Sequence, residues 1–220
     1  MNLFPSMHEH DLTEQRKWMV DSQIRRRGIS DERVLGAMLK VERHLFIEDS
    51  LRLLAYRDSP LSIGFDQTIS QPYIVALMAE SASLDKDDVV LEVGTGSGYQ
   101  AAILAELVRK VYSVEILEVL SRKTHELLKS LSYQNVRTKV ADGYEGWPEH
   151  APYDAILVSA AADHIPMPLV RQLSAGAKMI IPVETVKGLQ HLISVKKRED
   201  GTYAQQMIEA VRFVPLVRSS

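Results

Sequence analysis

One short segment rich in glycine is the part of this sequence best suited to hold a small ligand. It follows an apolar run and reads G-T-G-S-G, and its members are Gly94, Thr95, Gly96, Ser97 and Gly98. Glycine adopts backbone angles that other residues avoid and lets a ligand approach the main chain closely. The spacing differs from the G-x-G-x-x-G of a dinucleotide site, so it does not predict a pyrophosphate cradle. A plain tight turn is the competing interpretation.

Carboxylates follow the glycine segment at two positions. Glu115 ends the next apolar segment, about 20 residues after Gly94, where an acid can accept hydrogen bonds from ribose hydroxyls. Asp142 and Gly143 follow the third apolar segment, and a carboxylate beside a backbone N–H suits the edge of an adenine ring. Each acid alone could be a solvated loop carboxylate. All three features would meet at the carboxyl ends of parallel strands, so together they predict a pocket for an adenosine without a diphosphate.

A framework of parallel strands is needed to bring these residues together. Strands are predicted at 89–93, 110–115, 136–140, 153–158 and 178–183, and helices at 99–108, 118–131 and 168–173. Such alternation is typical of a doubly wound α/β fold with right-handed crossovers. Two further extended segments, 190–197 and 203–214, flank the turn sequence Asp200-Gly201. We therefore predict a mostly parallel sheet of seven strands that closes with an antiparallel hairpin.

The first 85 residues have a different, mainly helical pattern. Helices are predicted at 11–27, from a cap at Ser30 to about residue 39, and at 72–83, with one further helical turn at 51–55. The segment 58–71 is predicted to be a loop. We divide the chain into a helical extension with this loop, residues 1–85, and an α/β domain, residues 86–220, with both parts packed on the same core.

The composition excludes several kinds of site. The chain has 220 residues, a net charge of −3 and no cysteine, so disulfides and thiolate sites are excluded. Its seven histidines show no metal-ligand spacing, and we predict no metal. No basic face points to nucleic acid, and the apolar runs fall far short of the ~20 residues that span a bilayer. We expect a cytoplasmic protein that binds neither membranes nor nucleic acid and is a monomer.

Four segments resemble those of one enzyme family. They are V-L-E-V-G-T-G-S-G-Y-Q at 90–100, P-L-S-I-G-F-D-Q-T-I-S-Q-P at 60–72, D-G-Y with G-W and A-P-Y-D at 142–154, and R-F-V-P-L at 212–216. Together they resemble the protein-L-isoaspartate O-methyltransferases, which are class I methyltransferases with a Rossmann-like sheet. Many methyltransferases share the glycine segment, whereas T-I-S-Q-P is far more specific. The resemblance extends from about residue 20 to residue 216.

The resemblance implies a reaction and a set of roles. A methyl group would pass from S-adenosylmethionine, which becomes S-adenosylhomocysteine, to the free carboxylate of L-isoaspartyl residues in damaged proteins and peptides, initiating their repair. Glu92 would lie near the methionine end of the cofactor. Ser70 and Thr68 would hold the acceptor carboxylate, and the peptide site would include Ile69, Gln190 and Val214. A carboxylate is already ionised at neutral pH, so the reaction needs no general base.

Three residues depart from the pattern of the family. They are Glu42, Asp66 and Glu184, and the last two could add negative charge near a carboxylate substrate. Two other functions stay open. The chain could be a methyltransferase for a small molecule or RNA, against which the Thr68–Pro72 segment and the lack of a basic surface argue. It could also be a scaffold that binds a nucleoside without turnover.

Overall fold

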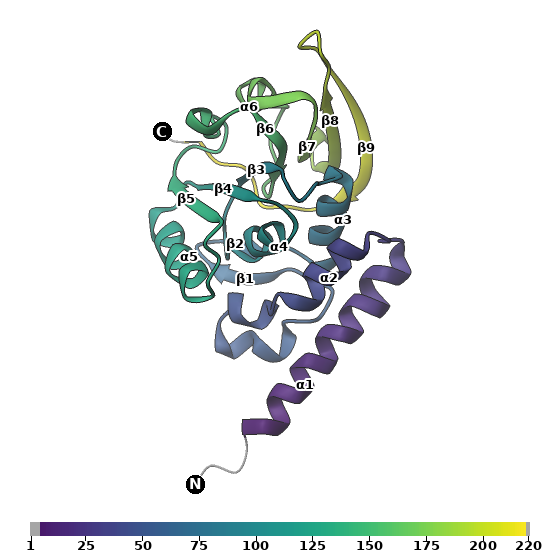
Figure 1. Cartoon of the computed structure of the whole chain (residues 1–220), viewed down its shortest axis with the longest axis vertical. Helices are drawn as coiled ribbons and strands as arrows, with labels where there is room; N and C mark the ends of the chain where they lie inside the picture. The colour runs from purple at the N-terminus through teal and green to yellow at the C-terminus, as the bar shows by residue number, and fades with distance from the viewer. Residues whose placement is uncertain (1–4, 219–220) are drawn as a thin grey trace.

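A seven-stranded sheet forms the centre of the computed structural model, which describes residues 5–218 and the side chains from residue 11 onward (Figure 1). The spatial order is β5-β4-β3-β6-β7-β8-β9. These strands are β3 (Val89–Val93), β4 (Lys110–Glu115), β5 (Val136–Val140), β6 (Tyr153–Val158), β7 (Leu173–Val186), β8 (Leu189–Lys197) and β9 (Tyr203–Val211). The first five in spatial order run parallel, and β8 is antiparallel to both of its neighbours. The predicted α/β fold is confirmed.

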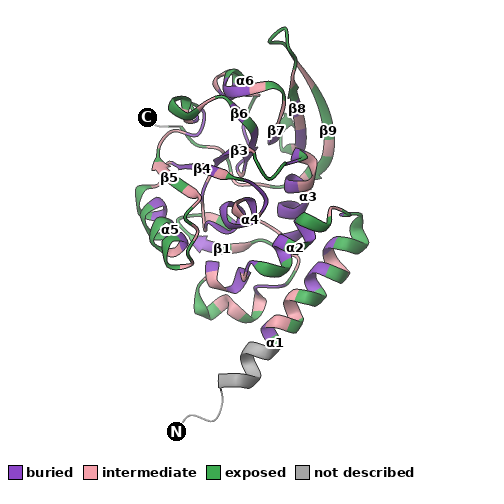
Figure 2. Cartoon of the chain, in the orientation of Figure 1, coloured by how far each residue is buried: buried purple, intermediate pink, exposed green. Residues whose placement is uncertain are grey.

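Helices cover both faces of the sheet (Figure 2). The α-helices are α1 (Pro5–Trp18), α2 (Glu32–Lys40), α3 (Pro72–Ala82), α4 (Tyr99–Leu107), α5 (Glu118–Ser130) and α6 (Met167–Gln172). Successive side chains of a strand point to opposite faces. In β6, Ala155 and Leu157 accordingly join the core cluster that contains α2 to α5, whereas Ile156 and Val158 join the cluster that contains α6. No helix within residues 5–218 is long and apolar enough to cross a membrane.

The N-terminal extension packs on the first of these clusters. After α1, the chain continues as a π-helical segment, η1 (Met19–Ile24), and a 3-10 turn, η2 (Arg25–Arg27). The prediction of one continuous helix over 11–27 is wrong in this respect. The wider π turn rotates the buried face, so Met19 and Val20 are buried and Trp18 is 59% exposed.

Short helical turns connect the extension to the rest of the chain. They are η3 (Arg43–Phe46) and η4 (Asp49–Leu54), and η5 (Pro148–His150) lies farther along.

The predicted cap of α2 is one residue too early. Asp31, not Ser30, is the N-cap, because its carboxylate accepts the N–H groups of Arg33 and Val34. The N–H groups of Ser30 and Asp31 instead donate to the Glu80 carboxylate at 2.7 Å.

The segment predicted as a loop contains a small β-hairpin. Strands β1 (Leu61–Gly64) and β2 (Gln67–Ile69) pair antiparallel around Phe65 and Asp66. Both turn residues have left-handed backbones, with φ of 54° and 56°. Such short strands show little periodicity, and Phe-Asp lacks the Asn-Gly signal of a two-residue turn. The sequence pattern therefore could not reveal this hairpin.

Two other boundaries differ from prediction. Strand β7 begins at Leu173 and extends to Val186, since it pairs with β6 at one end and with β8 along most of its length. Strand β9 ends at Val211, and the following residues leave the sheet. These residues, 212–218, cross the carboxyl ends of the central strands, and we call them the C-terminal strap.

Candidate active site

A cavity of about 270 Å³ lies at the carboxyl ends of β3 and β4. The strand order reverses between β3 and β6, and the crevice at such a point is the usual ligand site of an open α/β sheet. Four stretches form most of the wall, at 65–70, 92–97, 114–117 and 214–217. The first belongs to the β1–β2 hairpin and the last to the C-terminal strap. We call this the cofactor cavity.

The glycine segment forms one side of the cofactor cavity because its backbone turns sharply after β3. Gly94, Gly96 and Gly98 have φ of 91°, 51° and 86°, which favour glycine. The N–H groups of Gly94 and Thr95 both donate to the Val114 carbonyl of β4. Gly98 does not line the cavity. A Cβ there would lie 2.6 Å from Thr124 Cγ2, so this glycine permits close contact with α5.

Glu115 lies at the end of β4 on the floor of the cavity and is 7% exposed. Its Oε2 accepts the Gly96 N–H at 2.9 Å, and its Oε1 accepts the Leu117 N–H at 3.0 Å. These bonds fix the orientation of the carboxylate. Each oxygen retains a further lone pair, so the pair of oxygens can accept the two hydroxyls of a ribose.

Glu92 is fully buried within β3 and lines the same cavity. Ser113 donates a hydrogen bond to its Oε2 at 2.5 Å, and therefore the Thr95 hydroxyl donates to Ser113 at 2.6 Å. Oε1 has no partner among the described residues. Burial raises the pKa of Glu92 to about 8. An unpaired buried oxygen facing a cavity fits a cationic donor, such as the ammonium of an amino-acid ligand.

Gly143 and Asp142 occupy different places around the cavity. Gly143 lines the wall, and a Cβ there would lie 2.6 Å from Val93 Cγ1, so only glycine fits. Asp142 lies just outside the lining, and its carboxylate accepts the Tyr144 N–H at 2.9 Å. This bond shapes the turn that presents the Gly143 backbone.

Strand β2 contains Thr68 and Ile69, and Ser70 follows this strand just before α3. All three line the cofactor cavity, and Thr68 and Ser70 also line a second cavity beside it, whereas the Ile69 side chain is almost fully buried. The Ser70 hydroxyl has no hydrogen-bond partner among residues 11–218. It does not cap α3 either, because the Asp58 carboxylate accepts the Tyr73 N–H at 3.1 Å and the Gln71 amide at 2.7 Å.

The second cavity, of about 890 Å³, is a groove that lies between the start of α3, the start of β8 and the end of β9. We call it the acceptor groove. Gln190 lines it, with a side-chain amide that bonds both backbone groups of Phe213, at 2.6 Å to the N–H and 3.2 Å to the carbonyl. Val214 lies instead in the wall of the cofactor cavity. Its carbonyl accepts the Ala161 N–H at 2.8 Å, which places the strap across the central strands.

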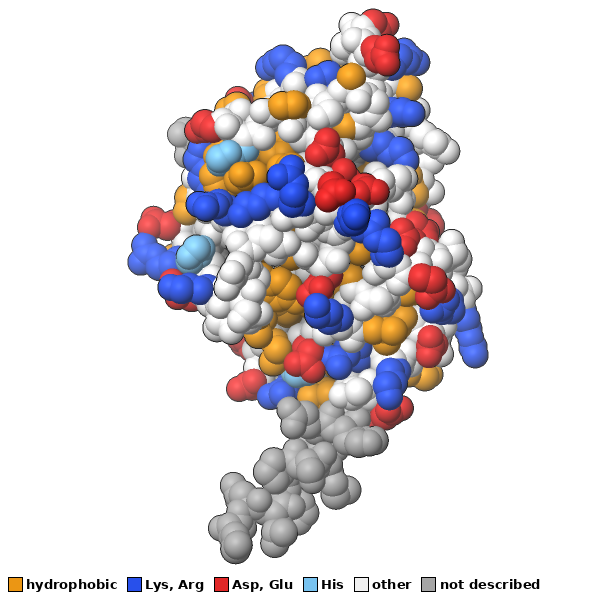
Figure 3. Space-filling model, viewed as in Figure 1, with side chains coloured by type: hydrophobic (Ala, Val, Ile, Leu, Met, Phe, Trp, Pro, Cys, Tyr) orange, Lys and Arg blue, Asp and Glu red, His pale blue; other side chains and the backbone are white. Residues whose placement is uncertain are grey.

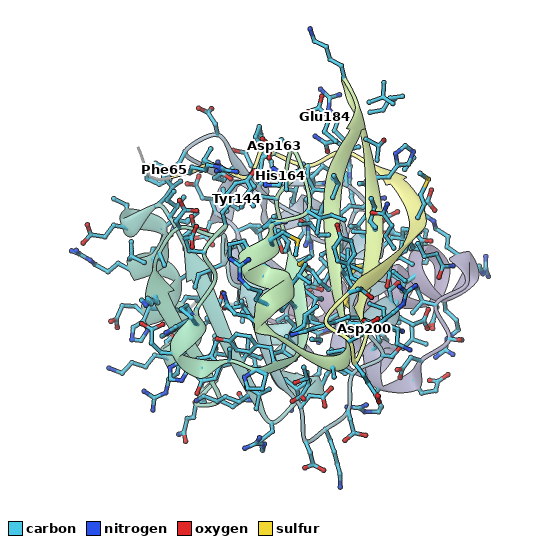
Figure 4. All side chains as sticks on the ribbon, turned by 90° about the horizontal axis from the view of Figure 1, so that it is seen from above. Phe65, Tyr144, Asp163, His164, Glu184 and Asp200 are labelled. Atoms are coloured by element: carbon cyan, nitrogen blue, oxygen red, sulfur yellow. The ribbon has the colours of Figure 1, made fainter. Side chains whose placement is uncertain are left out.

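The far end of the strap reaches a polar cluster beside the cavity. The Tyr144 hydroxyl donates to Asp163 at 3.0 Å, the guanidinium of Arg218 lies 4.0 Å from the centre of the Tyr144 ring, and His164 is next to Asp163 (Figure 4). Sequence reasoning missed these residues, because their contacts join distant segments. It also missed Ser113, although a buried serine in an apolar strand is itself a signal.

The three residues that depart from the family pattern lie in different surroundings. Asp66 lines the cofactor cavity. Glu184 lines neither cavity: its carboxylate accepts the Gly188 N–H at 2.7 Å, and Figure 4 shows it far from Phe65. Glu42 forms an ion pair of 2.9 Å with Arg16. Of these three departures from the family pattern, only Asp66 therefore adds a negative charge to the lining of a cavity. Within the described part of the chain, no group of three or more potential ligand side chains could hold a metal ion.

Comparisons with known proteins identify the family of this chain. A family model described as protein-L-isoaspartate(D-aspartate) O-methyltransferase (PCMT) matches residues 14–220. A protein-L-isoaspartate O-methyltransferase of Synechococcus sp. (strain JA-2-3B'a(2-13)) is 53% identical over 209 residues, covering 92% of this chain and 85% of that protein. One of Pelobacter propionicus is 49% identical over 213 residues, covering 97% and 94%.

Solved structures show the same fold. A putative protein-L-isoaspartate O-methyltransferase of Plasmodium falciparum, in complex with S-adenosylhomocysteine, has a TM-score of 0.80 and 27% identity, covering 93% of this chain and 99% of that chain. Another protein-L-isoaspartate O-methyltransferase has a TM-score of 0.83 and 30% identity over 92% of this chain, which spans 65% of that chain's length. The family match, the relatives and the cavity lead to one conclusion: this chain is a methyltransferase that uses S-adenosylmethionine and belongs to the PCMT family.

Proposed function

We propose that this chain transfers the methyl group of S-adenosylmethionine to the free carboxylate of L-isoaspartyl residues in damaged proteins and peptides, initiating their repair. The observation that carries this proposal is the position of Thr68 and Ser70. They are the residues that line both the cofactor cavity and the acceptor groove. An acceptor carboxylate held by these hydroxyls would face the cofactor cavity while the rest of the peptide lies in the groove.

The cofactor cavity contains groups suited to each part of S-adenosylmethionine. Glu92 Oε1 would accept the ammonium, Glu115 the ribose hydroxyls, and the Gly143 backbone the adenine edge. The glycine segment would let the ligand lie against the main chain. When bound, the ligand supplies an electrophilic methyl group on a sulfonium.

The residues of the acceptor side orient the nucleophile. The Ser70 hydroxyl is free to donate to one carboxylate oxygen and leaves the other oxygen to attack. Thr68 can donate beside it. Alignment of two reactants can contribute roughly 7–11 kcal/mol to catalysis. The buried Ile69 and the strap residues Val214–Val217 limit water at the reacting atoms, and water would otherwise hydrate the carboxylate.

Gln190 has an indirect part in this proposal. Its amide holds Phe213 in place, so it positions the strap and the end of the groove.

Residues 1–85 supply the two hydroxyls and residues 86–220 supply the cofactor groups. Since one chain provides both cavities, we propose that it acts as a monomer, and we place it in the cytoplasm. Light scattering during gel filtration tests the monomer.

The face of the molecule shown in Figure 3 gives no support to an RNA acceptor. On the face shown in Figure 3, Lys and Arg side chains are interspersed with Asp and Glu, without the continuous basic field that phosphate binding needs. A small-molecule acceptor would leave the acceptor groove without a use. Both alternatives can be distinguished by experiment.

The test uses labelled S-adenosylmethionine and two peptides that differ only in L-isoaspartate or L-aspartate at one position. Base-labile label on the isoaspartyl peptide alone is the expected result. Label on neither peptide, with S-adenosylhomocysteine still bound, would contradict the proposed acceptor. Label on both would contradict the proposed specificity.

A further inference from the structure

The acceptor groove carries a positive charge that the reaction itself does not use. Arg212 lines this groove, and no carboxylate side chain is among the described residues that line it. The guanidinium is exposed and forms no hydrogen bond or ion pair with any residue from 11 to 218. A groove of this kind, in a chain with a net charge of −3, favours an anionic group on its occupant.

The backbone on both sides of Arg212 is held in place. Val211 ends β9 and is paired with Gln190 of β8. Phe213 follows, with both backbone groups bonded to the Gln190 side chain. The Cα of Arg212 is therefore fixed between two anchored residues, and its guanidinium can reach only a limited part of the groove.

The carboxylate that becomes methylated is not the partner of this guanidinium. It must face the cofactor cavity at Thr68 and Ser70, and Arg212 does not line that cavity. A tight ion pair would also reduce the nucleophilicity of the reacting oxygen. The guanidinium is therefore available for a second carboxylate on the same peptide, the side chain of an Asp or Glu near the isoaspartyl residue.

We infer that Arg212 is a specificity residue that favours isoaspartyl segments with an acidic side chain next to the damaged residue. This inference rests on the proposed function and adds a preference among its substrates. An exposed ion pair is a modest interaction, so the expected preference is about two- to fivefold in kcat/KM for Glu over Gln at the neighbouring position, with Lys below Gln.

The experiment measures kcat/KM for peptides with one isoaspartyl residue and Glu, Gln or Lys on either side of it. The peptides are acetylated and amidated, because a free C-terminus would supply a carboxylate of its own. His191→Gln is a further control variant at the other basic residue of the groove, and it should keep the preference. About 0.5 M NaCl should reduce the preference by screening.

Arg212→Gln should bring the Glu-to-Gln ratio close to one, mainly through KM, whereas Arg212→Lys should keep part of it. Arg198→Gln is the matched control, since Arg198 bonds Thr202 at the β8–β9 turn and lines neither cavity. A wild-type enzyme without the preference, or an Arg212→Gln enzyme that keeps it, would overturn the inference while the proposed function stands. No methylation of any isoaspartyl peptide would overturn the proposed function itself.

Discussion

The Ser113 hydroxyl donates a hydrogen bond of 2.5 Å to Glu92 Oε2 below the cofactor cavity, and the other carboxylate oxygen has no partner among the described residues. This arrangement connects ligand binding to the ionisation of Glu92. Without a cation nearby, burial raises the pKa of this carboxyl to about 8. A bound ammonium would favour the ionised form and lower the pKa again.

We therefore expect the affinity for S-adenosylhomocysteine to increase with pH up to about pH 8. Below the raised pKa of Glu92, binding must remove a proton, so Kd should fall by at most about tenfold for each pH unit gained. Calorimetry in buffers with different ionisation enthalpies measures both Kd and the released proton. Glu92→Gln should bind more weakly without this pH dependence. A wild-type Kd independent of pH would show that Glu92 does not carry the linkage.

The same carboxyl predicts how the stability of the ligand-free protein depends on pH. The pKa of Glu92 is about 8 in the folded state against 4.5 for an ordinary Glu, so the folded state binds the proton more tightly. Its contribution to the free energy of unfolding is greatest below about pH 4.5 and is lost as the pH rises to about 8, by at most about 1.4 kcal/mol per unit. Urea unfolding of wild type and Glu92→Gln isolates this contribution, because the difference between the two should change with pH. A constant difference would contradict it.

Ser70→Ala should lower kcat/KM for an isoaspartyl peptide by roughly 10- to 100-fold, the effect of one hydrogen bond to a charged group. Affinity for S-adenosylhomocysteine and the unfolding midpoint should change little, because the Ser70 hydroxyl makes no hydrogen bond within the described chain. Ser30→Ala is the control, since that exposed hydroxyl has no hydrogen-bond partner among residues 11–218 either and lies outside both cavities. Equal activity of Ser70→Ala and Ser30→Ala would remove Ser70 from the mechanism.

Gly98→Ala should destabilise the protein by about 2–4 kcal/mol, because a left-handed backbone and a close contact act together. The φ of this residue is 86°, and the new Cβ would lie 2.6 Å from Thr124 Cγ2. Gly201→Ala is a matched control, with a φ of 82° and open space around the Cβ, and should cost only about 1 kcal/mol. Urea midpoints of the two variants compare them directly. Equal losses would show that the contact with Thr124 relaxes without cost.

Phe65→Asn should raise the free energy of unfolding by about 0.5–1 kcal/mol. Phe65 is 56% exposed and has a φ of 54°, a region that Asn adopts more readily than an aromatic residue. Val186→Asn serves as a control on another exposed apolar residue, whose φ is not positive, and should give no gain. If Phe65→Asn is less stable than wild type, Phe65 makes a compensating contact at the lip of the cofactor cavity.

The sequence predicts the centre of the sheet well because β3 and β6 are short apolar runs, the first followed by a glycine, and because β4 ends at an acidic residue. All seven strands were expected near their observed positions, and the glycine segment was expected at the end of β3. The elements that differ depend on tertiary contacts. The π-helical turn after Trp18 and the hairpin around Phe65 are imposed by packing against the rest of the chain. Asp31 and Ser30 are equally suitable caps by residue type, and the structure separates them because the Asp31 carboxylate accepts the N–H groups of Arg33 and Val34.

The site was predictable to a similar extent. Local motifs identified Gly94, Glu115 and Gly143, which line the cofactor cavity in the structure. The buried bond from Ser113 to Glu92 joins two adjacent strands, so it depends on a register that no local motif encodes. The positions of Gln190 and Arg212 likewise depend on where the chain leaves the sheet after β9.

The two cavities share Thr68 and Ser70 and otherwise draw on different parts of the chain. The carboxyl ends of β3 and β4 form the floor of the cofactor cavity. The start of β8 and the end of β9 form much of the acceptor groove. Selection can therefore act on the two sides almost separately. Substitutions at Leu189 or Arg212 would change the acceptor groove and leave the residues that line the cofactor cavity unchanged. For enzyme engineering, a library confined to 188, 189, 191 and 210–212 would explore new acceptors and keep the Gln190–Phe213 hydrogen bonds that hold the strap at the cofactor cavity.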